Sequence, residues 1–140
     1  MDNPRYLLCF EQAGYIEVFD IAKNYEKLLE HHHLSNEWII DACQAESPDE
    51  YCIAIYERGL EFIQLAFPEK GKIVVEESFQ TSYFAFQKIH AICRLTAEHY
   101  LVAISGKREL YIFDKSQATV SNRIPFVDES VSVVRFNSIQ

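Results

Sequence analysis

Two apolar runs separated by a short turn occur three times along the 140-residue chain, and this repeat constrains the fold more than any other feature. The first run opens on a tyrosine in each copy, and the copies begin 45 and 49 residues apart, at Tyr6, Tyr51 and Tyr100. Three of the four glycines lie in the turns between the runs, at Gly14, Gly59 and Gly106. Because glycine tolerates the positive φ that tight hairpin turns often require, the repeat predicts three similar β-hairpins.

Each hairpin is accompanied by two further runs of strand length. One follows the hairpin, at residues 26–30, 71–75 and 120–126, and another lies at residues 38–43, 88–94 and 130–136. Four strands in a period of about 40–45 residues are typical of a β-propeller blade. The predicted fold is therefore all-β, with four-stranded antiparallel blades at about residues 5–36, 37–82 and 87–127. Residues 130–136 are predicted to be a strand of a further or partner blade.

Short motifs strengthen this interpretation. Phe19-Asp20 and Phe113-Asp114 look like the Trp-Asp pair that ends the third strand of a WD40 repeat, although the middle copy has Ile63-Gln64. Ser47-Pro48-Asp49 resembles the turn that commonly joins the first two strands of that repeat. The chain thus resembles the WD40-like propeller family over nearly its whole length. No Gly-His dipeptide precedes a blade, so the family's internal Asp-His-Ser/Thr-Trp network is not carried over, and Kelch-type or other propellers remain alternatives.

A helix competes with the repeat at one place, because Ile21, Tyr25, Leu28 and Leu29 fall at helical spacing. The repeat favours a strand from Glu26 onward.

Three blades leave the ring unfinished, since closed propellers usually have about four to eight blades. The chain is either a partial propeller, with the remaining blades elsewhere in a parent protein, or half of a two-chain ring completed by a second copy. The first alternative is favoured, because most WD40-like propellers are closed by a single chain.

Charge and cysteine use limit the partners and the compartment. The net charge of −8 repels phosphate backbones, which argues against nucleic acid and is compatible with a basic protein partner. The longest apolar run has six residues, too few to span a membrane. The four cysteines lack C-x-x-C spacing, and the N-terminus does not look like a signal peptide, so a reducing, cytoplasmic location is predicted.

The cysteines align with small apolar residues of the repeat. Cys9 is matched with Ala54 and Ala103, and Cys43 is matched with Cys93 and Val134. All four are therefore predicted to be reduced, small core residues that react slowly with thiol reagents.

The sequence contains no recognised catalytic motif, and no cofactor is expected. His31 and His33 could share a strand face and hold a metal, but solvated polar residues after a strand are the favoured interpretation, with no metal site. His90 is expected to be a hydrogen-bonded core histidine, and His99 is expected in a turn.

The function that best fits is a non-catalytic scaffold for protein–protein interaction, within a larger intracellular complex. The alternative is an enzyme or small-ligand module that uses the propeller channel. The strands expected to line that channel, at residues 38–43, 88–94 and 130–136, are mostly apolar. Possible partner-binding residues are exposed aromatics and the apolar residues of the last strand: Trp38, Tyr83, Phe84, Val131, Val133 and Phe136. The aromatics are also typical of a core.

Overall fold

The structure is a computed structural model that describes residues 5–69 and 72–126. These residues form three antiparallel sheets, each made of consecutive strands. The first sheet contains β1 (Tyr6–Phe10), β2 (Tyr15–Asp20) and β3 (Glu26–His32). The second contains β4 (Ile39–Gln44), β5 (Glu50–Ile55), β6 (Gly59–Glu69) and β7 (Lys72–Thr81). The third contains β8 (Ile89–Arg94), β9 (His99–Ile104), β10 (Glu109–Asp114) and β11 (Thr119–Pro125).

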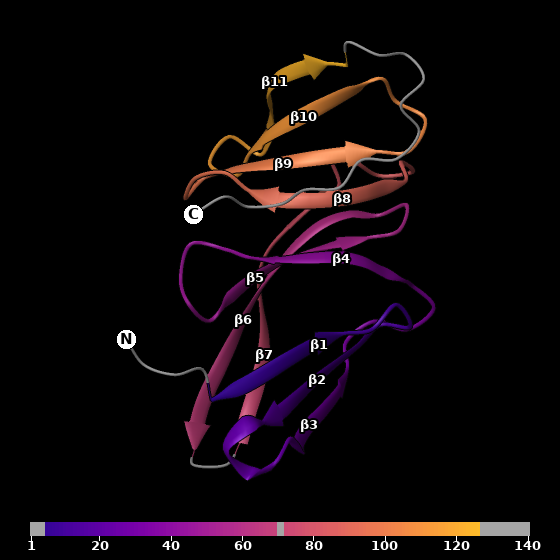
Figure 1. Cartoon of the computed structure of the whole chain (residues 1–140). Coiled ribbons are helices and arrows are strands. Elements are labelled where there is room, and N and C mark those ends of the chain that lie inside the picture. Colours follow the sequence, from indigo (N-terminus) through magenta and orange to yellow (C-terminus); the bar gives the residue numbers. More distant parts are fainter. Residues whose placement is uncertain (1–4, 70–71, 127–140) are drawn as a thin grey trace.

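The three sheets follow one another in a stack (Figure 1). The second and third sheets have four strands in the orders β4-β5-β6-β7 and β8-β9-β10-β11, while the first has β1-β2-β3. The first strands of the second and third sheets, β4 and β8, contact each other. The predicted all-β architecture of consecutive antiparallel sheets is confirmed. The strand predicted at residues 130–136 lies outside the described residues.

The predicted turn glycines have a clear structural role at two positions. Gly14 has φ 96° and Gly59 has φ 134°, both in the range that favours glycine. A Cβ on Gly14 would lie 2.4 Å from the carbonyl oxygen of Leu34, and one on Gly59 would lie 2.6 Å from that of Thr81. Gly14 therefore lets its hairpin turn pack closely on Leu34, just after β3, and Gly59 lets its turn pack on Thr81, the last residue of β7.

The chain between β2 and β3 resolves the competition with a helix in favour of the strand. A short 3-10 turn covers Ile21–Lys23 and ends at Asn24, which has a left-handed conformation. The strand then begins at Glu26, as the repeat predicts. Among the described residues, no helix has the length and apolar character needed to cross a membrane.

The alignment of the first copy is wrong by one residue. Leu7, Tyr51 and Tyr100 stand opposite Phe19, Ile63 and Phe113 in their sheets, so Leu7, rather than Tyr6, corresponds to the two later tyrosines. Consequently Phe10 corresponds to Ala54 and Ala103, and Cys9 corresponds to Ile53 and Val102. Backbone pairing, rather than the matching of tyrosines, sets the register, and a one-residue shift moves a side chain to the other face of the sheet.

Two cores separate the sheets. Between the first and second sheets lies an aliphatic cluster with Phe10 at its margin: Ile16, Leu34, Ile39, Ile53, Ile55 and Ile63. The core between the second and third sheets is rich in aromatic rings: Phe62, Phe84, Tyr100, Tyr111 and Phe113. Alternate residues of β5 contribute to both cores, because successive side chains point to opposite faces of a strand. Ile53 and Ile55 face the first sheet, while Cys52 and Ala54 face the third.

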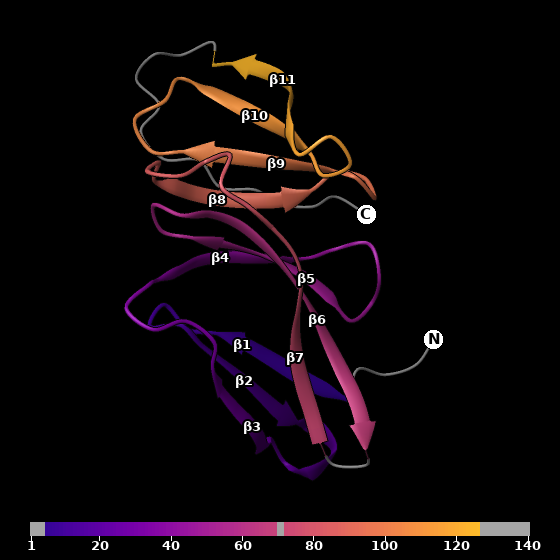
Figure 2. The same cartoon turned by 180° about the vertical axis from the view of Figure 1, so that it is seen from behind.

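The hairpin of β6 and β7 is longer than the other hairpins, and it reaches past the second sheet alongside the first (Figures 1 and 2). β7 contacts β3, and Val75 packs against the aliphatic core. The second sheet thus holds the first both by its face and by this extension.

Candidate functional site

The connections from β3 to β4, from β5 to β6 and from β7 to β8 lie at one edge of the stack, on the right in Figure 1, and backbone hydrogen bonds join them. The N–H of Tyr56, just after β5, donates to the carbonyl of Trp38 before β4 at 2.9 Å. The N–H of Phe86, between β7 and β8, donates to the carbonyl of Glu57 at 2.7 Å. We call residues 33–38, 56–58 and 82–88 the loop edge. Its backbone is held in place by these bonds, so its side chains are presented in a fixed arrangement.

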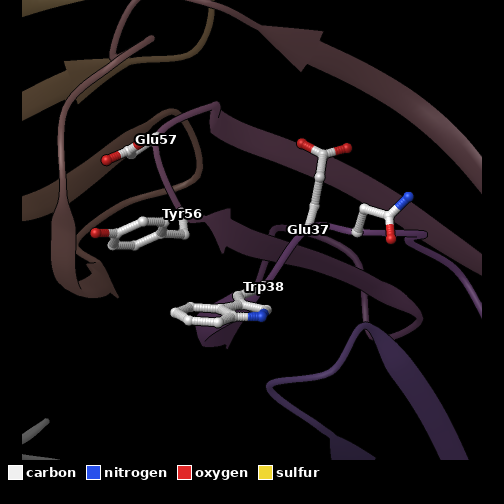
Figure 3. Close-up of a pocket in the computed structure, with 5 residues that line it drawn as sticks. Glu37, Trp38, Tyr56 and Glu57 are labelled. Atoms are coloured by element: carbon white, nitrogen blue, oxygen red, sulfur yellow. The ribbon is translucent and has the colours of Figure 1, made fainter.

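A pocket of about 300 Å³ opens at the loop edge between Asn36, Glu37, Trp38, Tyr56 and Glu57. The rings of Trp38 and Tyr56 pack against each other with centroids 5.5 Å apart and an interplanar angle of 42°. Figure 3 shows the two rings together, with Glu57 pointing to the same side as the Tyr56 hydroxyl and Glu37 pointing away from both rings. Trp38, the only tryptophan of the chain, is 51% exposed.

The two carboxylates of the pocket differ in their partners. Glu37 binds Arg58 at 3.1 Å, and the same guanidinium binds Glu61 at 3.1 Å. Glu57 is exposed, and the structure gives its carboxylate no hydrogen bond or ion pair with another described residue. Glu57 therefore places a carboxylate with no direct ion pair among the described residues beside an aromatic pair, which is an arrangement that attracts cations.

Two neighbours complete the surface. The side chain of Phe86 is 90% exposed at a positive φ of 65°. The ammonium of Lys88 lies 6.0 Å from the centroid of the Tyr56 ring. An exposed aromatic cluster of this kind, held on a fixed backbone, is characteristic of a binding surface for a protein or peptide.

The structure separates the predicted partner-binding residues. Trp38 lies in the pocket, whereas Tyr83 is 42% exposed and lines a second pocket with Tyr111 and Arg123. Phe84 lacks the exposure expected of a partner-binding residue, because its ring is buried against Tyr111 and Phe113 and is only 1% exposed. Val131, Val133 and Phe136 lie outside the described residues.

Sequence reasoning did not select Tyr56 or Glu57. Both follow the end of β5 directly, and Glu57 takes a positive φ of 58° at the turn before Gly59. The signal that could have found them is their position, since the repeated turn containing Gly14, Gly59 and Gly106 brings each such segment to the same edge.

The histidine cluster does not consist of solvated residues after a strand, as the sequence suggested. His31 and His32 belong to β3, and a ring nitrogen of His33 is hydrogen-bonded to the buried carboxylate of Glu61. The His31 and His33 rings are neighbours, with centroids 5.6 Å apart. Within residues 5–69 and 72–126, no group of three or more His, Cys, Asp or Glu side chains is placed to hold a metal ion.

The other histidines occupy ordinary structural positions. His90 is half-buried rather than in the core, because it is the extra residue of a bulge where β8 pairs with β9. His99 begins β9, and its ring contacts Thr96 at 2.9 Å and Asp114 at 3.6 Å.

The four cysteines are free thiols, with Cys52 buried and the other three half-buried. Cys43 and Cys52 stand directly opposite each other on β4 and β5. Burial raises the pKa of the Cys52 and Cys93 thiols, which keeps them in the less reactive protonated form.

Comparison with known proteins supports the fold. No protein-family model matches the sequence, and no curated protein matches it. The described architecture is similar to the β-propeller domain of Cps50 (Swd1) from Myceliophteria thermophila, with a TM-score of 0.68 and 16% sequence identity. The match covers 86% of this chain and 40% of that domain chain, so this chain spans less than half the length of its structural neighbour. The chain therefore has a β-propeller fold, and the WD40-like repeat remains a resemblance of sequence.

Proposed function

We propose that this chain forms part of a WD40-like propeller and serves as a non-catalytic scaffold for protein–protein interaction in a larger intracellular complex. The observation that carries the proposal is the exposed Trp38 ring, packed on half-buried Tyr56, beside Glu57, whose carboxylate has no partner among the described residues. Aromatic residues are enriched at the energetically important centres of protein interfaces. The similarity to a propeller domain is compatible with this role, since propellers present their loops on a rigid ring of sheets.

The partner chemistry follows from the pocket. A lysine or arginine side chain could lie against the exposed aromatic face while its charge meets Glu57. The net charge of −8 would draw such a basic segment toward the surface. We therefore propose that the pocket takes a basic side chain from a partner protein.

β4, one of the strands expected to line the channel, supports a non-catalytic role. Asp41 is an acidic residue of β4, and both of its carboxylate oxygens accept backbone hydrogen bonds at 2.9 Å, from Ala42 and from Ile92 of β8. The Asp41 carboxylate ties two neighbouring sheets together, which leaves it poorly suited to acid–base chemistry in a channel.

Trp38 provides a direct test because it is the only tryptophan. We expect a short peptide with one arginine between neutral residues to change the Trp38 emission saturably. The same peptide with citrulline, the neutral counterpart of arginine, should not. Glu57→Gln should weaken the arginine peptide by roughly tenfold, since hydrogen bonds to charged groups contribute about 1.5–3 kcal/mol.

Glu46→Gln, at an exposed carboxylate in the turn between β4 and β5, is the matched control and should bind as the wild type does. Equal responses to both peptides would show that the pocket does not select a charge. An emission unchanged by either peptide would contradict its assignment as a binding site.

A further inference from the structure

The two end sheets of the stack each have a face that no other described sheet covers. On the first sheet, Ile16 and Phe10 point into the aliphatic core, so Leu7, Cys9 and Phe19 point the other way. On the third sheet, Tyr100, Val102, Tyr111 and Phe113 point into the aromatic core, so the alternate residues point outward. We call the first surface the entry face (Leu7, Cys9, Phe19) and the second the exit face (Leu101, Leu110, Ile112).

Both faces carry apolar side chains, and the entry face also holds the ion pair of Glu17, opposite Cys9, with Lys27. Leu7 is 44% exposed, and the remaining residues of both faces are half-buried. At the margin of the exit face, Ile124 stands opposite Leu110 and is also 44% exposed. Apolar residues on the outer faces of end sheets predict that something packs there.

The register of the strands shows which internal surfaces of the stack are equivalent to the entry face and to the exit face. Leu7 occupies the position of Tyr51 and Tyr100, because each stands opposite its counterpart among Phe19, Ile63 and Phe113. Ile112 occupies the position of Phe62, because they stand opposite Leu101 and Cys52, which are themselves equivalent. The entry face is thus equivalent to the surfaces that receive a preceding sheet, and the exit face is equivalent to those that receive a following sheet.

Inside the chain, these two kinds of surface contact each other. Phe62 of the second sheet packs edge-on against Tyr100 of the third, with ring centroids 5.1 Å apart. The equivalent contact between the two open faces would join Ile112 to Leu7. These two residues lie on opposite end sheets of the described chain, and a second copy would supply the partner surface for each.

We propose that the exit face of one copy packs on the entry face of a second copy, and the reverse, which closes a ring of two chains. Two copies with three sheets each would provide six sheets, within the range of about four to eight blades found in closed propellers. The interface is head-to-tail and buries in both directions the surfaces that the stack leaves open. The interface does not use the aromatic pocket, so its test is independent of the test of the proposed function.

The unequal sheets support a second copy as the occupant. β5 and β9 each pair with a preceding strand, β4 and β8, whereas the described residues provide no such strand for β1. Residues 130–136, outside the described part, carry the same apolar pattern as the segments 38–43 and 88–94. The sequence of a second copy therefore includes a segment with the pattern of the preceding strand that β1 lacks among the described residues.

Two single substitutions and their mixture test the geometry. By light scattering after size exclusion, we expect the wild-type chain to have twice the mass of one chain. Leu7→Glu and Ile112→Lys should each give monomers when purified alone, because each places a charge in both interfaces of the ring. Mixing the two variants should restore the dimer, since one interface is then wild type and the other pairs the introduced glutamate with the introduced lysine.

Val74→Lys is the matched control, at a residue of β7 that is 40% exposed and lies on neither open face, and it should leave the dimer intact. Circular dichroism of each variant checks that loss of the dimer is not loss of folding. A monomeric wild-type chain would overturn the proposal and favour the missing blades of a longer protein as the occupant. A dimer that both substitutions leave intact, or that mixing fails to restore, would overturn the head-to-tail arrangement.

Discussion

The second sheet packs against its two neighbours with different chemistry at one equivalent position. Toward the first sheet it presents Glu61, which is 1% exposed and bound by His33 and Arg58. The third sheet presents Tyr111 at the corresponding position of β10, and its ring packs on Phe84 with centroids 6.4 Å apart. The same place in the repeat is therefore filled by an ion pair in one interface and by two rings in the other.

This difference shows how a repeated fold tolerates unlike sequences. The aromatic interface is stabilised by burial, which is not directional and is lost in proportion to the atoms removed. The polar interface depends on each partner being present, because a buried charge without its partner is costly. The two interfaces should consequently fail under different substitutions and at different pH.

The largest effect is expected in the aromatic interface. Phe84→Ala should lower the free energy of unfolding by about 3–5 kcal/mol, because it opens a cavity among Tyr83, Tyr111 and Phe113. Urea unfolding monitored by circular dichroism measures the change. Phe10→Ala, at a half-buried ring in the other interface, should cost less. Equal losses would mean that the aromatic core is not the stronger one.

The polar interface should show a smaller loss that a second substitution can recover. Glu61→Ala should cost about 1–3 kcal/mol, because it leaves the His33 ring and one contact of Arg58 unsatisfied. The double variant Glu61→Tyr with His33→Phe places two rings at this position, as in the other interface. Its free energy of unfolding should be closer to that of the wild type. A double variant less stable than Glu61→Ala would show that the position does not accept rings.

These two interfaces also show what the sequence could and could not predict. The repeat located the strands and the tight turns at Gly14 and Gly59, because strand length and turn chemistry are local properties. It did not separate Phe84 from Phe86, which lie two residues apart in one connection, one buried and the other 90% exposed. No alternation rule applies in a loop, and the hydrogen bond from Phe86 to Glu57 that fixes the difference is long-range.

The aromatic interface contains one polar defect, and its removal should be tolerated. The hydroxyl of Tyr100 is buried, with no hydrogen-bond partner among the described residues. Tyr100→Phe should leave stability at neutral pH unchanged or raise it by about 1 kcal/mol, since an unsatisfied buried polar group is costly. Burial raises the pKa of Tyr100 above its ordinary value of about 10.

The unfolded chain therefore ionises this tyrosine at a lower pH than the folded chain, and stability should fall as the pH rises above about 10. Tyr100→Phe should reduce that alkaline loss in urea titrations at pH 8–11. If the variant is clearly less stable at neutral pH, the hydroxyl has a partner outside the described residues.

The smallest effect is expected in the polar interface at acid pH. His31 lies opposite Ile16 on the face of the first sheet that meets the second. Burial, and then the neighbouring His33 and His32, lower the pKa of His31 below its ordinary value of about 6.5. The unfolded chain then takes up a proton on this histidine at a higher pH than the folded chain does. The contribution of neutral His31 to the free energy of unfolding is therefore complete above pH 6.5 and declines as the pH falls below it.

His31→Asn keeps a polar side chain without this titration and should flatten the decline between pH 7 and pH 5, measured as the urea midpoint at half-unit steps. Because Tyr100 acts only above pH 10, the same variant should leave the alkaline limb unchanged, which separates the two interfaces in one titration. An acid decline that persists unchanged in His31→Asn would assign it to carboxylates such as Asp114, whose pKa is lowered by the hydrogen bond from Ser116.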